Sequence, residues 1–550
     1  MGIPYYFTYL IKNYTNKIIK PLNSINNIFY LFIDSNSIIY DSIDFENFTS
    51  TLSFETNLIN NVIKKLESLI NIIKPNKDKI IYIAVDGIPP MAKIIQQKKR
   101  RYKSAYISKL FDKNPLWDTC NITPGTNFMN KLDSTIENHF KNHKFYSNII
   151  LDLSKTPGEG EHKIFKYIRN IKNSNNNALV YGMDADLIML SLIHTKYFKN
   201  IFLYRETPIF INSIDNSLDP NNNYIIDIFE LGIIIFEKLT NEKFLSSEYE
   251  MPLWLVNAEI DISGNTKTKL YKNTYHNKIN DYIFICFLLG NDFLPHFPSI
   301  NIRINGITIL LDLYRELFNL NKNLTYNNTI IWGNFKKYIG KLAENENMFL
   351  KKIYNFRSKN SNKYYNNYNT EELFNISPTQ YRNIEIFINP YEEGWEYRYY
   401  YSLFDIDTDK KPDSISEITN NYLLTLQWTL IYYSHDCPNW KYYYKFHYPP
   451  LVSDLYNNIP YFESELTLKN DNINNDIHPY LLLSYVLPKN SLHLLPTNIH
   501  NYLLTNYENL YREDYEILYP FCKYFWESHV KFPELDFEKF SKEISTLIKS

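Results

Sequence analysis

The sequence predicts an α/β fold, in which a mostly parallel central sheet is flanked by helices and joined by a second, largely helical lobe rich in aromatic residues. Over roughly the first 330 residues, short β-branched and aromatic runs alternate with helical stretches, which is the pattern of βαβ units. From about residue 420 onward the pattern is helical and aromatic, with prolines between the helical stretches. Because 550 residues are too many for one compact core, we expect cooperating subdomains.

These observations divide the chain into three predicted regions. Residues 1–330 form the α/β region, in which the candidate catalytic groups lie. Residues 331–419 form a connector, because the stretch from Asn355 to Tyr381 contains a polar, low-complexity segment typical of an exposed loop. Residues 420–550 form a second region that we expect to pack on the first.

Four strands are expected in the α/β region, and three of them run directly toward an acidic residue. The expected strands are Phe29–Ile33, Ile80–Val85, Asn148–Leu151 and Ala178–Tyr181. Ligands of an open α/β sheet bind beyond the carboxyl ends of its strands. We therefore expect Asp34, Asp86 and Asp184 at one rim of the sheet.

Further acids follow in short patterns, and together they suit a metal site. The seven candidates are Asp34, Asp86, Glu159, Glu161, Asp184, Asp186 and Asp292. Mg²⁺ and Mn²⁺ prefer oxygen ligands, and a two-metal site that cleaves a phosphodiester needs several converging carboxylates. Any one Asp after a strand is commonly a turn or N-cap residue. The repeated placement favours metal-dependent phosphate chemistry.

A basic stretch between Ala92 and Ala105 holds six cations and no acid. If this stretch is helical, one face carries the donors Lys93, Gln97, Arg100 and Arg101, which together could bind a terminal phosphate. The simpler alternatives are a solvated charged helix or a nuclear-localisation run.

Composition excludes several classes of protein. The net charge of -2 rules out a globally basic nucleic-acid binder, so polyanions would have to meet local basic patches. The four cysteines are scattered and without zinc-site spacing, which favours a reducing, intracellular compartment. Apolar runs such as Tyr282–Gly290 are shorter than the roughly 20 residues that span a bilayer, so we expect no membrane association.

The order of these patterns resembles the XRN family of 5′→3′ exoribonucleases, including the run Pro-Gly-Glu-Gly-Glu-His-Lys. The matching segments of the first region are Met1–Pro4, Asp34–Tyr40, Val85–Lys93, Gln96–Arg101, Ile122–Thr126, Pro157–Lys163, Gly182–Leu190 and Gly290–His296. Those of the second are Leu426–Trp428, Trp440–Tyr444, His447–Pro450, Ser484–Pro488 and Leu494–Pro496. The resemblance implies a catalytic core like that of 5′ nucleases and PIN domains.

The resemblance also implies roles for individual residues. The seven acids would form the Mg²⁺-binding catalytic centre, with Mn²⁺ as an alternative ion, and Lys93, Gln97, Arg100 and Arg101 would hold a 5′-phosphate. Relatives stack the first base between a His and a Trp. Here Tyr40 stands at the His position and Trp440 is the candidate Trp, while an ordinary buried aromatic is the alternative for Trp440.

The expected activity is Mg²⁺-dependent, processive 5′→3′ degradation of single-stranded RNA that carries a 5′-monophosphate, giving nucleoside 5′-monophosphates. The expected protein is a monomer with decapping or RNA-decay factors as candidate partners, in the cytoplasm rather than the nucleus. Two alternatives stay open. One is a flap-type or DNA-directed 5′ nuclease, and the other is a catalytically silent RNA-binding scaffold.

Overall fold

The computed structural model describes residues 2–46, 48–76, 79–113, 115–141, 143–171, 176–245, 267–361, 368–460, 468 and 477–549. Part of the polar low-complexity segment predicted between Asn355 and Tyr381, residues 362–367, lies outside the described residues.

Within the described residues, seven strands form the main sheet in the order β1-β7-β6-β5-β2-β3-β4. Strand β2 pairs in parallel with both β3 and β5, whereas β7 pairs antiparallel with β6 on one side and with the edge strand β1 on the other. The strands are β1 Ile19–Pro21, β2 Ile28–Asp34, β3 Ile80–Ala84, β4 Ile149–Asp152, β5 Asn177–Tyr181, β6 Ile201–Tyr204 and β7 Tyr224–Asp227. Two hairpins lie apart from this sheet, β8 Thr325–Tyr326 with β9 Thr329–Ile330 and β10 Glu516–Leu518 with β11 His529–Lys531.

Alternating side chains bury both faces of the sheet. On β2, Phe32 belongs to one apolar cluster, whereas Leu31 and Ile33 belong to the cluster on the opposite face. This is the two-residue period of a strand, and the near-continuous apolar run is typical of a parallel sheet covered on both sides.

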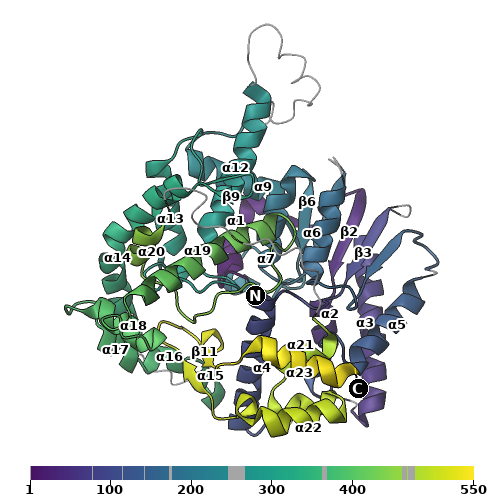
Figure 1. Cartoon of the computed structure of the whole chain (residues 1–550). Coiled ribbons are helices and arrows are strands. Elements are labelled where there is room, and N and C mark those ends of the chain that lie inside the picture. Colours follow the sequence, from purple (N-terminus) through teal and green to yellow (C-terminus); the bar gives the residue numbers. More distant parts are fainter. Residues whose placement is uncertain are drawn as a thin grey trace.

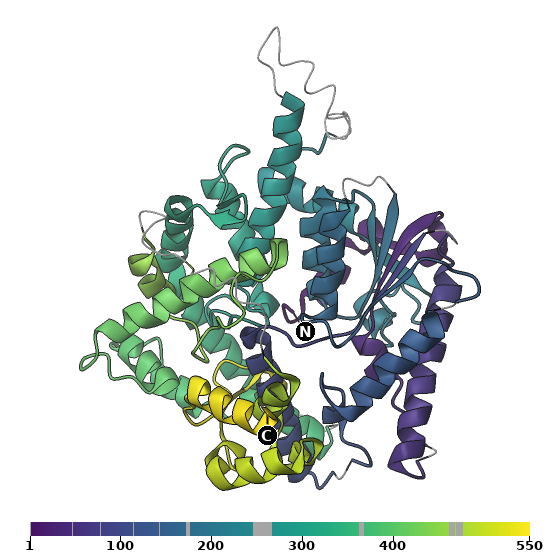
Figure 2. The ribbon, with the colours of Figure 1, turned by 45° about the vertical axis from the view of Figure 1, so that its right-hand side comes forward.

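Helices cover each face and continue into the second region. Those of the first region are α1 Tyr6–Ile18, α2 Asn36–Asp41, α3 Thr51–Ile73, α4 Met91–Leu110, α5 Asn127–Phe140, α6 Gly160–Asn170, α7 Asp186–Ile193, α8 Ile211–Ile214, α9 Ile228–Thr240, α12 Lys267–Phe287 and α13 Gly306–Leu317. Helices α3 and α5 pack on one face of the sheet, and α6, α7 and α9 on the other (Figures 1 and 2).

Ten further helices follow α13 in the described residues. They are α14 Trp332–Ser361, α15 Thr370–Asn375, α16 Ser377–Gln380, α17 Asn383–Ile388, α18 Trp395–Phe404, α19 Asp413–Ser434, α20 Val452–Asn458, α21 Pro479–Val486, α22 Thr497–Asn506 and α23 Phe537–Lys549. Helix α19 packs on α7, and α21 packs on the basic helix α4 (Figure 1). One apolar cluster runs from Ile3 to Leu468, so the first and later regions share a core.

The predicted fold class is confirmed. The four expected strands are β2, β3, β4 and β5, each within one or two residues of the predicted bounds, whereas β1, β6 and β7 were not expected. The division into three regions stays a prediction. None of the four cysteines, all described, forms a disulfide. Among the helices of the described residues, none is both long and apolar enough to cross a bilayer.

Candidate functional site

Parallel pairing brings the first acids to one rim of the sheet. Asp34 is the last residue of β2 and pairs in register with Ala84, the last residue of β3, so Asp86 lies two residues beyond the end of that neighbouring strand. Asn36 holds Asp86, because its side-chain amide donates to Asp86 Oδ2 and its Oδ1 accepts from the Asp86 backbone N–H at 3.3 Å. Two of the three acids predicted at this rim, Asp34 and Asp86, therefore lie at neighbouring strand ends.

Helix α6 adds two more carboxylates through its amino terminus. Glu159 is the N-cap residue and Glu161 lies in the first turn, where the helix dipole favours negative charge. The backbone N–H of Gly160 donates to Asp86 Oδ1 at 2.6 Å. A Cβ at Gly160 would lie only 2.8 Å from Asp34 Oδ1, so the glycine allows the helix to approach both aspartates.

Asp184 and Asp186 come from the turn between β5 and α7, and Asp292 follows α12. Asp186 is the first residue of α7 and is buried. Gly2 has a φ of +56°, and a Cβ there would lie 2.2 Å from Asp186 Oδ1. The amino-terminal segment therefore packs directly against the acid cluster, which only glycine permits.

Lys93 of α4 reaches into this cluster. Its Nζ lies 2.6 Å from Glu159 Oε2 and 2.7 Å from Asp292 Oδ2. Burial alone would lower the pKa of Lys93, but Asp292 and Glu159 outweigh burial and raise it well above its ordinary value. The same ammonium holds the pKa of the Asp292 carboxyl below its usual range, although burial acts in the opposite direction.

Three of the other carboxylates, Asp34, Glu161 and Asp186, lack enough positive charge to offset their burial. Burial, followed by the charge of Asp86, raises the pKa of Asp34 well above its usual value. Burial, followed by Glu159, does the same to Glu161. The pKa of Asp186 is raised to about 7 by burial and by Asp292.

This cluster suits a divalent cation. Within the described residues, Glu161 Oε2 and Asp186 Oδ1 are buried oxygens without a hydrogen-bond partner, and an uncompensated buried charge is costly. Hard cations take such oxygen ligands. Ligand atoms of Glu159, Glu161 and His162 also lie within 4.8 Å of one another, although imidazole suits Mg²⁺ less well than carboxylate does.

The predicted phosphate-binding residues all lie on α4 but differ in surroundings. Arg101 contacts Gln97 Oε1 at 3.4 Å and Thr123 Oγ1 at 2.8 Å, while Arg100 is exposed. Lys93 pairs with the carboxylates instead of standing in a separate basic pocket. Helix α4 therefore runs from the acid cluster, which Lys93 contacts, to a cationic surface that includes Arg100. The spacing of the residues in the sequence did not indicate the contact of Lys93 with the acids.

The two predicted stacking residues lie near opposite parts of α4. Tyr40 is 37% exposed and lines a hollow of about 720 Å³ together with Arg100 and Arg101. Trp440 is half-buried, and its carbonyl accepts from the backbone N–H of Met91 at 2.8 Å. A role for both in stacking stays a prediction.

Sequence reasoning missed the aromatic residues of α19 that touch the acids. Tyr432 donates to Glu159 Oε1 at 2.9 Å, and its ring stacks on His162 with a centroid distance of 3.7 Å. Tyr433 lies near Asp186, and burial followed by the charge of that carboxylate raises the pKa of Tyr433 well above its usual value. Among so many tyrosines, no local signal singles out these two, because the contact joins residues more than 240 positions apart.

A carboxylate cluster beyond a parallel sheet, next to a cationic helix, defines a class of site suited to metal-dependent phosphate chemistry. Residues 1–207 match the family model described as "XRN 5'-3' exonuclease N-terminus", and residues 272–387 and 377–550 match the model "Xrn1 helical domain". The chain belongs to the XRN family.

Curated relatives agree with this assignment. The chain is 26% identical to human 5′-3′ exoribonuclease 1 over 83% of its length and 25% identical to the Saccharomyces cerevisiae protein of that name over 90%. It is 28% identical to 5′-3′ exoribonuclease 2 of Eremothecium gossypii over 64%. The matches cover only 29%, 40% and 42% of these three relatives, respectively.

Proposed function

We propose that this chain is a Mg²⁺-dependent 5′→3′ exoribonuclease that hydrolyses single-stranded RNA bearing a 5′-monophosphate, processively, to nucleoside 5′-monophosphates. The observation that carries the proposal is the position of Lys93. It links the carboxylates Glu159 and Asp292 to the helix that also bears Gln97 and Arg101. Cleavage chemistry and recognition of a terminal phosphate are thereby only a few helical turns apart.

Different residues bind the terminal phosphate, hold the metal and orient the carboxylates. Gln97 and Arg101 bind the terminal phosphate, since a guanidinium and an amide supply several donors to one anion. The seven acids hold Mg²⁺, which when bound activates water and stabilises the leaving 3′-oxygen. Tyr432 and Asn36 fix the orientation of Glu159 and Asp86. Each cleavage leaves a new 5′-phosphate for the same donors, which supports repeated cycles.

The relatives' names support the same activity. All three are named 5′-3′ exoribonucleases, and 5′-3′ exonuclease is also the description of the matching family model. Stacking of the first base by Tyr40 and Trp440 belongs to this proposal, as does a contribution of about 1–3 kcal/mol per stacked base to RNA binding.

The test compares end-labelled RNAs that carry a 5′-monophosphate, a 5′-hydroxyl or a cap, each with Mg²⁺ and with a chelator. We expect rapid release of mononucleotides only from the 5′-monophosphate RNA with Mg²⁺. A flapped DNA duplex and single-stranded DNA are included in parallel. Preference for either DNA would support a DNA-directed nuclease, and RNA binding without cleavage would support a silent scaffold.

A further inference from the structure

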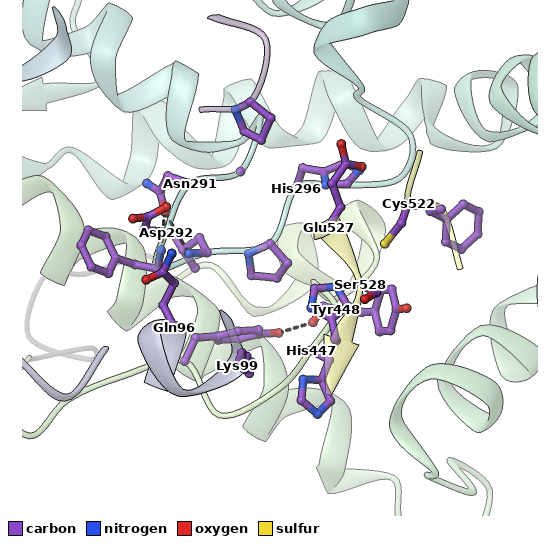
Figure 3. Close-up of a pocket in the computed structure, with 18 of the residues that line it drawn as sticks. Gln96, Lys99, Asn291, Asp292, His296, His447, Tyr448, Cys522, Glu527 and Ser528 are labelled. Atoms are coloured by element: carbon purple, nitrogen blue, oxygen red, sulfur yellow. Dashed lines mark hydrogen bonds between the residues drawn. The ribbon is translucent and has the colours of Figure 1, made fainter. Parts of the chain in front are cut away.

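A cavity of about 210 Å³ lies beside the acid cluster, on the side of α4 that carries Gln96 and Lys99. Asn291 and Asp292 stand at one end of it, and Glu527 and Ser528 at the other, as Figure 3 shows. Phe293, Leu294 and Pro298 add apolar wall. The cavity therefore starts at a predicted catalytic acid and leads away from it.

Cations dominate the charge of this cavity. Lys99, Arg100, Lys103 and Arg303 line it, whereas its only lining carboxylates, within the described residues, are those of Asp292 and Glu527. Both acids already form ion pairs: Asp292 with Lys93 at 2.7 Å and Glu527 with Arg303 at 2.7 Å.

Lys99 is one of the lining cations that have no compensating carboxylate among the described residues. In the described part of the chain it forms no ion pair, and burial together with the nearby Lys103 lowers its pKa to about 8. His447 and His529 also line this cavity, and because burial lowers the pKa of each, both rings are neutral and leave the charge of the cavity unchanged. A sheltered cation that lines a cavity indicates a site for an anion.

A second cavity of about 410 Å³ continues outward from the first. The two share Pro298, Asn301, Arg303 and Phe521 in their walls. The outer cavity adds the cation Lys523 and also Arg357, whose charge Glu385 compensates at 2.6 Å, and it has no carboxylate among its described lining residues. Its volume lies within the roughly 300–1,000 Å³ that small-molecule sites occupy.

Aromatic rings and Arg303 form the outer part of this path. Tyr5 is 36% exposed, and the Arg303 guanidinium lies 5.9 Å from its ring centroid and 5.6 Å from that of Tyr524. Aromatic faces beside cations suit a nucleotide, because the base can stack while the phosphate meets the positive charge.

We infer that these adjoining cavities are the exit path for the nucleoside 5′-monophosphate product, an inference that rests on the proposed function. During processive degradation the remaining RNA fills the side of α4 that carries Gln97, Arg101 and Tyr40. The product therefore needs another way out. The path past Lys99 to Tyr5 and Lys523 starts at Asp292 and carries the charge that a phosphate monoester requires.

The experiment separates bond cleavage from product release. The substrate is a 5′-monophosphate RNA labelled in its first nucleotide, mixed with excess full-length protein and Mg²⁺. Denaturing quench measures cleavage, and rapid filtration, which retains bound nucleotide, measures release. The variants are Lys99→Glu, Lys99→Gln and, at the outer mouth, Lys523→Glu. Lys64→Glu, an exposed lysine of α3, is the matched control.

We expect Lys99→Glu to cleave the first bond within about twofold of the wild-type rate but to release the nucleotide roughly tenfold more slowly, since charge along a cleft alters ligand flux by that order. Lys99→Gln should lie between, Lys523→Glu should slow release about threefold, and Lys64→Glu should change neither step. Lys523 is exposed, so its replacement tests the path even if a Lys99 variant misfolds.

Two results would overturn the exit path alone: normal cleavage with unaltered release in every variant, or an equal slowing of both steps. Failure of the wild-type protein to cleave the 5′-monophosphate RNA would instead overturn the proposed function, and this inference with it.

Discussion

At the scale of single residues, the Glu161 carboxylate lowers the stability of the folded protein when no cation is bound beside it. Its Oε2 is buried and unpartnered within the described chain, and Glu159 lies beside it. We expect Glu161→Gln to raise the melting temperature of the chelator-treated protein by a few degrees. Removing the buried negative charge should add about 1 kcal/mol to the free energy of unfolding, which corresponds to a shift of this size. Nuclease activity should fall at least about 100-fold, because a metal ligand is lost.

Thermal unfolding with EDTA and with Mg²⁺ checks this expectation. Mg²⁺ should stabilise the wild-type protein more than the Glu161→Gln variant, since binding to the folded state alone adds stability. Glu137→Gln, on the exposed side of α5, is the control. Equal stabilisation of wild type and Glu161→Gln by Mg²⁺ would show that Glu161 does not contact the ion.

Arg101 carries the selectivity expected for a terminal phosphate. The Arg101→Ala variant loses a guanidinium that contacts Gln97 and Thr123. A charge-assisted hydrogen bond is worth about 1.5–3 kcal/mol, so kcat/KM on 5′-monophosphate RNA should fall roughly 10- to 100-fold. Activity on 5′-hydroxyl RNA should change little. If both substrates lost activity equally, Arg101 would serve the fold or the RNA backbone instead.

Which site residues were predictable depends on how each reaches the site. Asp34 and Asp86 follow predicted strands, so their meeting is a consequence of parallel pairing. Gly2 and Tyr432 reach the acids through tertiary packing, which leaves no local pattern. Lys93 was correctly assigned to a basic helix, but its pairing with Glu159 and Asp292 depends on where that helix docks.

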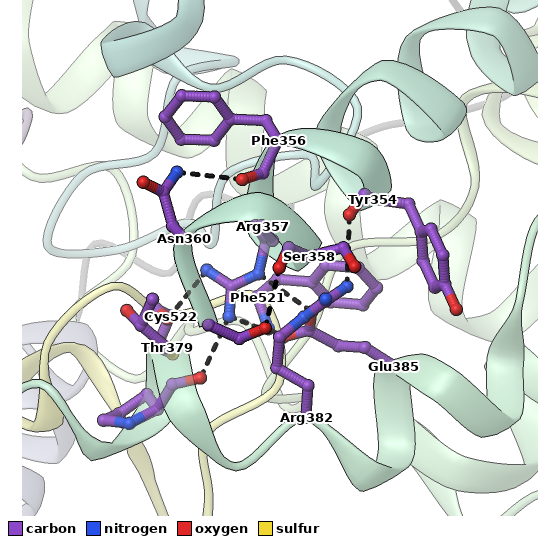
Figure 4. Close-up of polar contacts among 12 residues, drawn as sticks. Tyr354, Phe356, Arg357, Ser358, Asn360, Thr379, Arg382, Glu385, Phe521 and Cys522 are labelled. Atoms are coloured by element: carbon purple, nitrogen blue, oxygen red, sulfur yellow. Dashed lines mark hydrogen bonds and ion pairs between the residues drawn. The ribbon is translucent and has the colours of Figure 1, made fainter. Parts of the chain in front are cut away.

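At the scale of elements, a buried ion network ties α14 to α17 and to the segment before β11 (Figure 4). Glu385 accepts from Arg357 Nε at 2.8 Å and Nη2 at 2.6 Å and from Arg382 Nε at 2.7 Å. It also accepts from the backbone N–H of Phe521 at 2.8 Å, while Arg357 donates to the carbonyl of Cys522 at 3.0 Å. One carboxylate thus compensates two guanidinium groups.

Loss of that carboxylate should be strongly destabilising. We expect Glu385→Gln to lower the free energy of unfolding by about 3–5 kcal/mol, because two buried cations lose their counter-charge. Urea unfolding of the full chain measures the loss, with exposed Glu393→Gln as the matched control. A change below 1 kcal/mol in Glu385→Gln would mean that water solvates the network.

Glu346 links α14 to α20 in a pH-dependent way. Its carboxylate accepts from the backbone N–H of Val452 at 2.7 Å and of Ser453 at 2.9 Å, yet burial raises its pKa to about 7. A raised pKa means that the folded state binds the proton more tightly than the unfolded state. The contribution to stability is therefore greatest below the unfolded pKa and is lost as pH rises through 7.

Urea unfolding at pH 5 and pH 8 tests this sign. Between these values the wild-type protein should lose about 2–3 kcal/mol more unfolding free energy than Glu346→Gln does. Glu344→Gln, exposed on the same helix, should behave as the wild type. A wild-type protein that gains stability relative to Glu346→Gln as pH rises would show that the two backbone hydrogen bonds outweigh burial.

The elements themselves were predictable where they have a strong local pattern. Strands β2 to β5 are short apolar runs between turn residues, and each was located within two residues. Strand β1 has only three residues and ends in a proline, while β6 and β7 were missed although they are as long as the predicted β4. They join the sheet through pairing with distant strands.

At the scale of the whole molecule, the acid cluster is completed by residues from both halves of the chain. Helix α19 supplies Tyr432 and Tyr433 to Glu159 and Asp186, and its Trp428 is fully buried in the shared core. The basic helix α4 depends on the second half as well, because Tyr102 donates to the carbonyls of Leu487 and Leu510 at 3.1 and 3.2 Å. Residues 1–330 therefore hold the seven acids without holding a complete site.

A truncated chain of residues 1–410 tests this dependence, since it retains all seven acids and the whole of α4 but lacks α19 and α21. We expect it to bind hydrophobic dye, because the face of α7 that α19 covers would be exposed. Its RNA cleavage with Mg²⁺ should be at least about 1,000-fold slower, since catalytic groups must be held within a fraction of an ångström.

Tyr432→Phe in the full chain is the milder comparison, because it removes only the hydrogen bond to Glu159 and should slow cleavage by about tenfold. Full activity in the truncated chain would mean that residues 1–410 organise the carboxylates by themselves and that the later residues serve only to contact RNA.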